Sequence, residues 1–217
     1  LTLENFPITN YSKFKQFPYV VPLPNEQLMG TVSFGTLEYF YVIGEAWAHL
    51  VSKFLPSQPV VLDLGCGCGK LARFLYLNPN LRYIGVDIFL PSIKWCKIAF
   101  ASVSDRFRFE HFDGYSTVWN PSGKIASIDY KFPIDSGGVN FVVAGSLFTH
   151  LLEAECKHYL DEVCRVLTVG GLALISIHDE PKEGMLFSGD HSRIDISCDY
   201  FVQLAHDRLL HLQTDIG

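Results

Sequence analysis

The sequence has 217 residues, of which 48% are hydrophobic and 18% are charged, and its formal net charge is -6. This composition supports a single domain with a large apolar core and excludes an intrinsically disordered chain. The negative net charge argues against broad binding to the phosphate backbone of a nucleic acid. A local basic patch could still bind phosphates. The longest apolar stretch, residues 139–152, is too short to span a bilayer.

The six cysteines include no C-x-x-C pair, which argues against a structural zinc site, and we expect no bound metal. Cysteines that pack as small buried hydrophobes indicate a reduced compartment, so we expect the chain to be cytoplasmic. No membrane partner is expected, and the sequence leaves the oligomeric state open.

The first part of the chain predicts an arm followed by a helix. Residues 1–29 are rich in Pro, Asn, Tyr and Phe, and the prolines exclude a regular helix there. Apolar residues then recur at helical spacing over residues 36–55. The predicted organisation is therefore an N-terminal arm and cap helix over residues 1–56, followed by one domain over residues 57–217.

The stretch PVVLDLGCGCGKLARFL, residues 59–75, organises the rest of the chain. Its apolar run predicts a strand buried on both faces, and Asp63 lies inside that run, where a charge is costly unless it has partners. Gly65, Gly67 and Gly69 follow at alternate positions, which lets the backbone turn sharply and approach a ligand closely. Helical spacing resumes after the loop. A strand, a glycine loop and a helix in this order form the ligand-binding turn of a doubly wound sheet.

The spacing of the glycines distinguishes between cofactors. A dinucleotide site has the pattern G-x-G-x-x-G with a pyrophosphate at the helix N-terminus, whereas this loop is G-x-G-x-G. The carboxylate of Asp63 would repel a phosphate and attract an ammonium group. Asp87 stands near the end of the predicted strand Leu81–Ile88 and suits the two hydroxyls of a ribose. A ligand with a cationic end and a ribose but no phosphate fits S-adenosylmethionine.

Helices and strands alternate along the rest of the chain, which indicates an α/β fold with a parallel sheet. In chain order the sequence predicts a helix over 91–102, a strand over 106–112, a long irregular connection over 115–138, a strand over 139–144, a helix over 153–167 closed by Gly170-Gly171, a strand over 172–177, an insertion over 181–197, a helix over 198–206 and a sixth strand over 209–214. We expect the connection, the insertion and the N-terminal arm to define the acceptor site.

Five stretches resemble the class I S-adenosylmethionine-dependent methyltransferases: VLDLGCGCGKLARFL, IGVDI, FDG, VNFVVAGSLFTHL and LDEVCRVLTVGGLALIS. They occur in the family's order and cover residues 59–178. The resemblance implies a Rossmann-like, three-layer α/β/α fold with a doubly wound, mostly parallel sheet, and an S-adenosylmethionine-binding methyltransferase domain over residues 57–217. Family members end with a seventh, antiparallel strand. No sequence remains for this last strand, so we expect the chain to be part of a longer polypeptide.

The resemblance also implies site residues. Asp113, just past the third strand, matches the acid that binds the exocyclic amine of adenine in the family, although a simple turn acid is the alternative. Gly145 and Ser146 match positions whose backbone faces the methionine portion. The expected cofactor-binding residues are Asp63, Gly65, Cys66, Gly67, Gly69, Asp87, Ile88, Asp113, Gly114, Gly145 and Ser146.

Two histidines are candidate catalytic residues. His150 follows the fourth strand and His178 follows the fifth, and the carboxyl ends of such strands form the ligand-binding edge of an open α/β sheet. A near-neutral imidazole can take a proton from an acceptor hydroxyl or amine. For His150 the alternative is a structural role at the start of a helix. For His178 the alternative is a position on the solvent-exposed rim of the site, without a catalytic role.

The predicted activity is direct in-line transfer of a methyl group from S-adenosylmethionine to an oxygen or nitrogen atom of a small-molecule or glycan acceptor. Because the chain is acidic, we do not expect a nucleic-acid partner. A nucleic-acid or protein methyltransferase is the first alternative, and a protein that binds S-adenosylmethionine without catalysis is the second. The sequence carries no readable signature of the acceptor.

Overall fold

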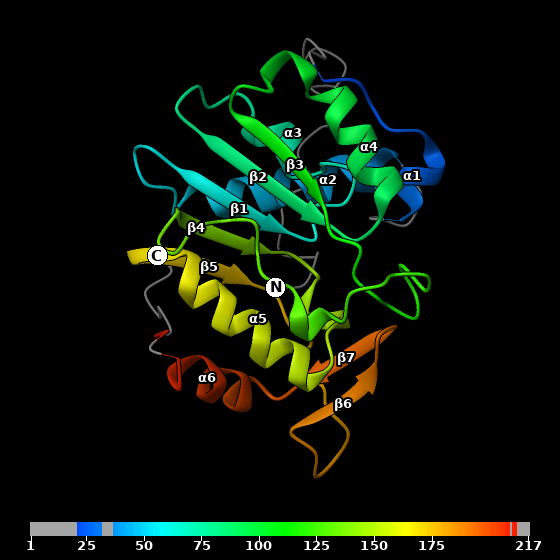
Figure 1. The fold of residues 1–217 in the computed structure, drawn as a ribbon, viewed down its shortest axis with the longest axis vertical. Coiled ribbons are helices and arrows are strands. Elements are labelled where there is room, and N and C mark those ends of the chain that lie inside the picture. The colour runs from blue at the N-terminus through cyan, green and yellow to red at the C-terminus, as the bar shows by residue number, and fades with distance from the viewer. Residues whose placement is uncertain (1–20, 32–36, 209, 212–217) are drawn as a thin grey trace.

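The computed structural model describes residues 21–31, 37–208 and 210–211. Its centre is a sheet of five parallel strands in the order β3-β2-β1-β4-β5 (Figure 1). The chain runs outward from β1 on one side and from β4 on the other, which leaves a crevice at the carboxyl ends of these two strands. The predicted doubly wound α/β fold is confirmed. The strands are β1 (Val60–Leu64), β2 (Arg82–Asp87), β3 (Phe107–His111), β4 (Val139–Ala144) and β5 (Leu167–Ile175).

Helices cover both faces of the sheet, as the three-layer prediction requires. Alternate residues of a strand face opposite layers, so Val61 packs toward α2, α3 and α4, whereas Leu62 packs toward α5 and α6. The short helix α1 contacts α2 and lies mostly within residues 1–29, where we expected no regular helix. That expectation is wrong because α1 begins after the last proline of the segment, Pro24, and Asn25 caps its first turn. The helices are α1 (Glu26–Gly30), α2 (Leu37–Ser52), α3 (Ala72–Leu75), α4 (Leu90–Ala99), α5 (Glu153–Val166) and α6 (Cys198–His206), with short 3-10 helices η3 (Ala101–Val103), η4 (Ser127–Asp129) and η5 (Phe148–His150).

The fifth strand begins earlier than the sequence predicts. We expected Gly170-Gly171 to close the preceding helix, but β5 starts at Leu167 and includes both glycines. The prediction is wrong because these residues form an irregularity inside the strand, where the register between β4 and β5 shifts. Gly170 has a φ of +76°, a conformation that glycine adopts readily at such a bulge.

The predicted insertion contains a two-stranded antiparallel hairpin, made of β6 (Phe187–Asp190) and β7 (Arg193–Ile196). Ile194 and Ile196 are fully buried in the same apolar cluster as the inner face of α5. The hairpin also packs on η5, which follows β4. Its tip therefore lies at the carboxyl edge of the central sheet, where ligands bind in this class of fold.

Two sequence predictions lie largely outside the described residues. The N-terminal arm falls mostly in residues 1–20, and most of the predicted sixth strand falls in residue 209 and residues 212–217. The domain boundary after residue 56 and the cytoplasmic location remain predictions. Across the described ranges, no helix combines the length and the apolar character that crossing a membrane requires.

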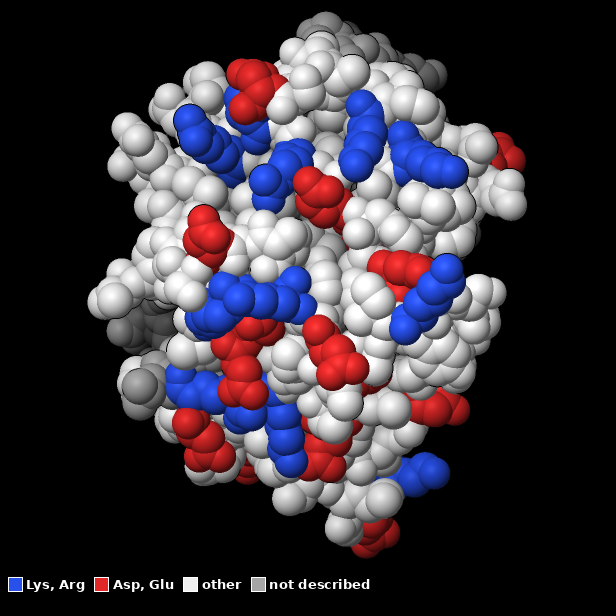
Figure 2. Space-filling view, in the orientation of Figure 1, with Lys and Arg blue, Asp and Glu red and all other residues white. Residues whose placement is uncertain are grey.

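Charged side chains are unevenly distributed over the face that Figure 2 shows. Lys and Arg prevail over the upper part, which is formed by α4 and β3, whereas basic and acidic side chains alternate over α5 and α6. On α5, Lys157 pairs with Glu153 and Arg165 pairs with Glu162. The net charge of -6 therefore does not describe every part of the surface.

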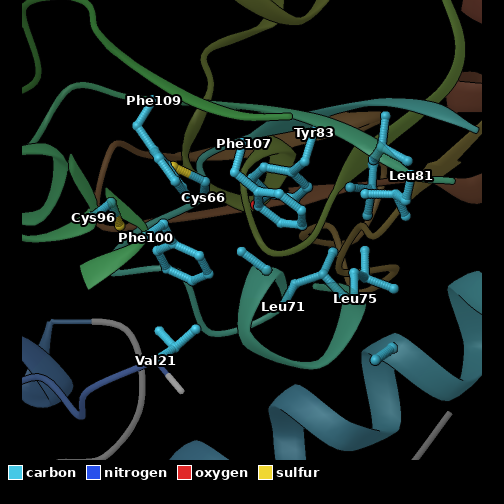
Figure 3. Close-up of a cluster of buried hydrophobic side chains, with 14 of the residues drawn as sticks. Val21, Cys66, Leu71, Leu75, Leu81, Tyr83, Cys96, Phe100, Phe107 and Phe109 are labelled. Atoms are coloured by element: carbon cyan, nitrogen blue, oxygen red, sulfur yellow. The ribbon is translucent and has the colours of Figure 1, made fainter. Parts of the chain in front are cut away.

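Aromatic rings fill the layer between the sheet and α4 (Figure 3). Tyr83 comes from β2, Phe107 and Phe109 come from β3, and Phe100 follows α4; each is no more than 3% exposed. The ring centroids of Tyr83 and Phe107 lie 5.1 Å apart, and those of Phe100 and Phe107 lie 5.7 Å apart. This stack holds the Tyr83 ring against β3 and α4, and the Tyr83 hydroxyl lies beside Asp63 of β1.

Candidate functional site

A cavity of about 690 Å³ opens at the carboxyl edge of the sheet, a size typical of small-molecule sites. The loops after β1, β2, β4 and β5, the connection after β3 and the tip of the hairpin contribute to its lining. Ten of the residues proposed from the sequence line it, namely Asp63, Gly65, Cys66, Gly67, Asp87, Ile88, Gly145, Ser146, His150 and His178. Gly69, Asp113 and Gly114 do not.

The glycine loop has the conformation for which the glycines were predicted. Gly65, Gly67 and Gly69 have φ angles of +75°, +53° and +78°, in the left-handed region that side chains disfavour. The amide nitrogens of Gly65 and Cys66 donate to the carbonyl oxygen of Val86, at 2.8 and 3.1 Å. Gly69 serves packing, because a Cβ atom there would lie 2.8 Å from the Phe100 ring.

Asp63 is a buried carboxylate at the cavity wall and is only 4% exposed. The hydroxyl of Tyr83 donates a hydrogen bond to its Oδ2 atom. Burial raises the pKa of Asp63 to about 7, an effect that this hydrogen bond offsets in part. A cationic ligand group beside Asp63 would favour the ionised carboxylate, so this position fits an ammonium ion.

Asp87 joins β2 to the glycine loop. Its Oδ2 atom accepts a hydrogen bond from the Gly67 amide and its Oδ1 atom accepts one from the Phe89 amide, both at 2.7 Å. Burial raises the pKa of Asp87, and these backbone donors oppose the rise. Each carboxylate oxygen keeps a further lone pair, so Asp87 can also accept hydrogen bonds from ligand hydroxyls.

His150 has a defined tautomer. Its Nδ1 atom lies 3.0 Å from the carbonyl oxygen of His191, which can only accept a hydrogen bond, so Nδ1 carries the hydrogen. Burial lowers the pKa of His150 below its ordinary value, which favours the neutral ring. The other nitrogen, Nε2, then has a free lone pair on a residue that lines the cavity.

His178 lines the same cavity and has an unsatisfied polar atom. Its Nδ1 is buried, and no hydrogen-bond partner for it exists among the described residues. Most buried polar atoms in folded proteins have a partner, so an orphaned one on a residue that lines a cavity is a candidate for a ligand contact. The neighbouring Asp179 does not share this role, because its carboxylate accepts the Cys198 amide at the start of α6.

A family model described as a methyltransferase domain matches residues 61–171 of the chain. The chain belongs to this family. The match includes β1 with its glycine loop, β2, β3, β4 and α5. The methyltransferase family that the sequence predicts is thereby confirmed.

Solved structures share the fold. Geranyl diphosphate C-methyltransferase from Streptomyces coelicolor, bound to S-adenosyl-L-homocysteine, is 17% identical with a TM-score of 0.59, and the alignment covers 79% of this chain and 61% of that one. The PH0226 protein from Pyrococcus horikoshii is 18% identical with a TM-score of 0.57, and the alignment covers 91% and 89% of the two chains. At these identities the likeness concerns the fold alone.

Two curated relatives bear names that concern tRNA. A tRNA (carboxymethyluridine(34)-5-O)-methyltransferase from Arabidopsis thaliana is 32% identical over 129 residues, which are 59% of this chain and 26% of that protein. A second tRNA (carboxymethyluridine(34)-5-O)-methyltransferase, named ALKBH8, from Macaca fascicularis is 28% identical over 134 residues, which are 60% of this chain and 17% of that protein. This methyltransferase therefore spans about a quarter or less of the length of these relatives.

The names of these relatives contradict our expectation that a nucleic acid is not a partner. That expectation rested on the net charge of -6, which sums charges over the whole chain. A net charge says nothing about where cations gather, and Lys and Arg do gather over α4 and β3 (Figure 2). The acidic balance is thus no argument against an RNA acceptor.

The sequence missed several cavity residues of this methyltransferase. Glu155 from α5 and His191 from the hairpin tip are both buried and line the cavity. The aromatic residues Trp47, Tyr115 and Trp119 line it as well. The sequence predicted only that the long connection, the insertion and the N-terminal arm would lie near the acceptor, and it identified none of these residues.

Asp113 and Gly114 lie beside the cavity but not in its lining. The Oδ1 atom of Asp113 accepts a hydrogen bond from the Asn120 side chain at 3.2 Å, and its carbonyl oxygen accepts the amides of Lys124 and Ile125. In this arrangement Asp113 organises the connection after β3. Its role toward adenine remains a prediction.

Ser146 shows that the turn after β4 is conformationally constrained. With a φ of +60° it is the one described residue other than glycine in the left-handed region. Its amide donates to the Ser176 hydroxyl at 2.7 Å, and its carbonyl oxygen accepts from Thr149. The preceding Gly145 lies against Trp47, whose ring would be 3.2 Å from a Cβ atom at that position. Strain of this kind gathers at functional sites.

Proposed function

We propose that this methyltransferase modifies RNA, and that its acceptor is the carboxylate oxygen of a carboxymethyl group on a uridine of tRNA. Two relatives that bear this activity in their names support the acceptor class. The observation in the molecule that carries the proposal is a cavity wall on which aromatic side chains and histidines stand together beside the cofactor residues.

The cavity residues fit the ammonium group and the ribose of S-adenosylmethionine. The buried carboxylate of Asp63 would accept the ammonium group, which would offset the cost of burying a negative charge. The bare backbone of the glycine loop would lie along the methionine chain, and Asp87 would accept the ribose hydroxyls. When bound, this cofactor supplies a methyl group on a positively charged sulfur, which is electrophilic without help from the protein.

The acceptor part of the cavity suits a base that carries an anion. Tyr115 is 44% exposed and Trp119 is half-buried, and flat aromatic faces stack on bases that have left a stem or loop. The ring of Trp119 meets that of His150 edge-on, with centroids 5.7 Å apart. The orphaned Nδ1 of His178 would donate a hydrogen bond to a carboxylate oxygen.

A carboxylate acceptor requires no general base. Its oxygen bonds to the methyl carbon as the bond from carbon to sulfur breaks, and the negative charge of the acceptor cancels the positive charge of the sulfur. No proton is released in this step. The protein then contributes alignment and the exclusion of water, which together lower a barrier by several kcal/mol. His178 would hold the carboxylate, and His150 would not need to remove a proton.

The test is methylation of a synthetic anticodon stem-loop RNA that carries 5-carboxymethyluridine, with S-adenosylmethionine as donor. Mass spectrometry is expected to find one methyl group on the modified RNA and none on the same RNA with plain uridine. A weakly buffered indicator is expected to register no proton release. Release of one proton per methyl would identify a hydroxyl or amine acceptor instead. Methylation of small molecules from a cell extract, with none on either RNA, would overturn the proposal.

A further inference from the structure

A basic surface outside the main cavity lies along α4 and the edge strand β3. Lys94 and Lys97 of α4 are three residues apart, so they share one face of the helix, and both are exposed. The side chain of Arg108 on β3 is 53% exposed. Figure 2 shows Lys and Arg gathered over this part of the molecule. We call Lys94, Lys97 and Arg108 the α4–β3 surface.

Few acids balance this surface. Residues 90–104 contain no Asp or Glu. Within the described ranges neither lysine forms an ion pair, and Arg108 meets one carboxylate, Glu110, at 3.3 Å. On α5, by contrast, Lys157 and Arg165 each pair with a glutamate of the same helix. The unpaired lysines therefore make the α4–β3 surface locally more positive than α5.

A second cavity, of about 260 Å³, opens on the α4–β3 surface. Lys97, Ser104 and Arg108 line it together with the aromatic residues Phe100, Phe107 and Phe109, and Glu110 lies at its wall beside Arg108. A recess with apolar rings and two cations suits a sugar with its phosphate. The rings are at most 3% exposed, so they form the floor of the recess, and Lys97 and Arg108 would supply the contacts to a phosphate.

We propose that the α4–β3 surface binds the phosphate backbone of the RNA whose acceptor nucleotide enters the main cavity. This inference rests on the proposed function. The occupant follows from charge complementarity, because exposed unpaired lysines on one helix face attract a polyanion. The RNA backbone would have a short distance to cover between the main cavity and this surface. Phe89 and Ser92 at the start of α4 line the main cavity, and the two lysines follow on the same helix. The ten residues of α4 span about 15 Å.

The first experiment measures binding alone. The complete chain is titrated against a fluorescent, unmodified anticodon stem-loop RNA at several salt concentrations. The Lys94→Gln/Lys97→Gln variant is expected to weaken binding about tenfold and to make the slope of log K against log salt shallower by about 1.4 to 1.8, as two lost phosphate contacts require. Lys53→Gln/Lys157→Gln removes the same charge from residues outside α4, β3 and the cavity lining, and it is expected to leave the slope unchanged.

The second experiment separates this inference from the proposed function. On RNA that carries 5-carboxymethyluridine, Lys94→Gln/Lys97→Gln is expected to lower kcat/KM about tenfold, whereas its activity on the free nucleoside stays at the wild-type value. The inference would be overturned if the α4 double variant and its control lost RNA affinity or kcat/KM equally. It would also be overturned if the wild-type chain did not bind RNA. Absence of methylation on both substrates would contradict the proposed function. The salt dependence of RNA binding would still test whether the α4–β3 surface binds RNA.

Discussion

Glu155 and His191 form a buried hydrogen bond between the first turn of α5 and the tip of the β6–β7 hairpin, with 3.1 Å between Oε2 and Nε2. The two residues are 9% and 7% exposed. The same carboxylate oxygen accepts the Leu152 amide, and the carbonyl oxygen of His191 accepts Nδ1 of His150. One pair therefore connects a helix, the hairpin and a histidine of the cavity.

Replacing His191 with alanine is expected to lower the free energy of unfolding by about 2 kcal/mol, because the buried carboxylate of Glu155 loses a hydrogen-bond partner. Urea unfolding measures the change. His49→Ala, at an exposed position of α2, is the matched control and is expected to change stability by less than about 0.5 kcal/mol. If both variants unfold alike, Glu155 and His191 do not hold the hairpin in place.

Cofactor affinity is expected to depend on pH through Asp63. With its pKa near 7, this carboxyl is mostly protonated at pH 6 and mostly ionised at pH 8. An ammonium ligand binds the ionised form, so affinity for S-adenosylhomocysteine should rise about tenfold across this range. Calorimetry at both pH values measures it. Asp63→Asn should bind more weakly at pH 8 and lose most of the pH dependence, whereas an unchanged profile would refute the assignment.

The same carboxyl is expected to affect the stability of the free protein in the opposite sense. Its folded-state pKa is raised, from an ordinary value of 3.8 to about 7, so the folded state holds the proton more tightly than the unfolded state. The unfolding free energy therefore falls as pH rises between these two values. At pH 8, Asp63→Asn should be more stable than the wild type by about 1 kcal/mol or more. Thermal unfolding without ligand tests this, and a less stable variant would contradict it.

Local patterns allowed the fold and the cofactor residues to be predicted. Asp63, the alternate glycines and Asp87 lie within two strands and the loop between them, so hydrophobic patterning alone brings them together. The parallel strands then place His150 and His178 at the same edge. These groups follow from periodicity because each lies in a strand or within six residues of its carboxyl end.

The rest of the site depends on contacts between distant segments. His191 lies 36 residues beyond Glu155, in a stretch without helical or strand periodicity that the sequence could assign. Which way Asp113 points is likewise decided by the Asn120 amide, across an irregular connection. The basic α4–β3 surface escaped notice because a net charge averages over faces that only the fold separates.

Replacing His178 with phenylalanine should separate stability from function. The change removes a buried polar atom that has no partner among the described residues, so the free energy of unfolding should stay equal or rise by up to about 1 kcal/mol. The KM for the carboxylate acceptor should rise at least about tenfold, because the proposed hydrogen bond is lost, whereas affinity for S-adenosylhomocysteine should not change.

His158→Phe provides the comparison, because His158 is also half-buried but its Nε2 atom lies 2.7 Å from the carbonyl oxygen of Tyr130. This variant should lose about 1 kcal/mol of stability and keep the KM of the wild type. A histidine that serves the fold and a histidine that serves the ligand therefore respond with opposite signs in the two measurements. If His178→Phe instead loses stability and keeps its KM, His178 has a structural partner and no part in binding the acceptor.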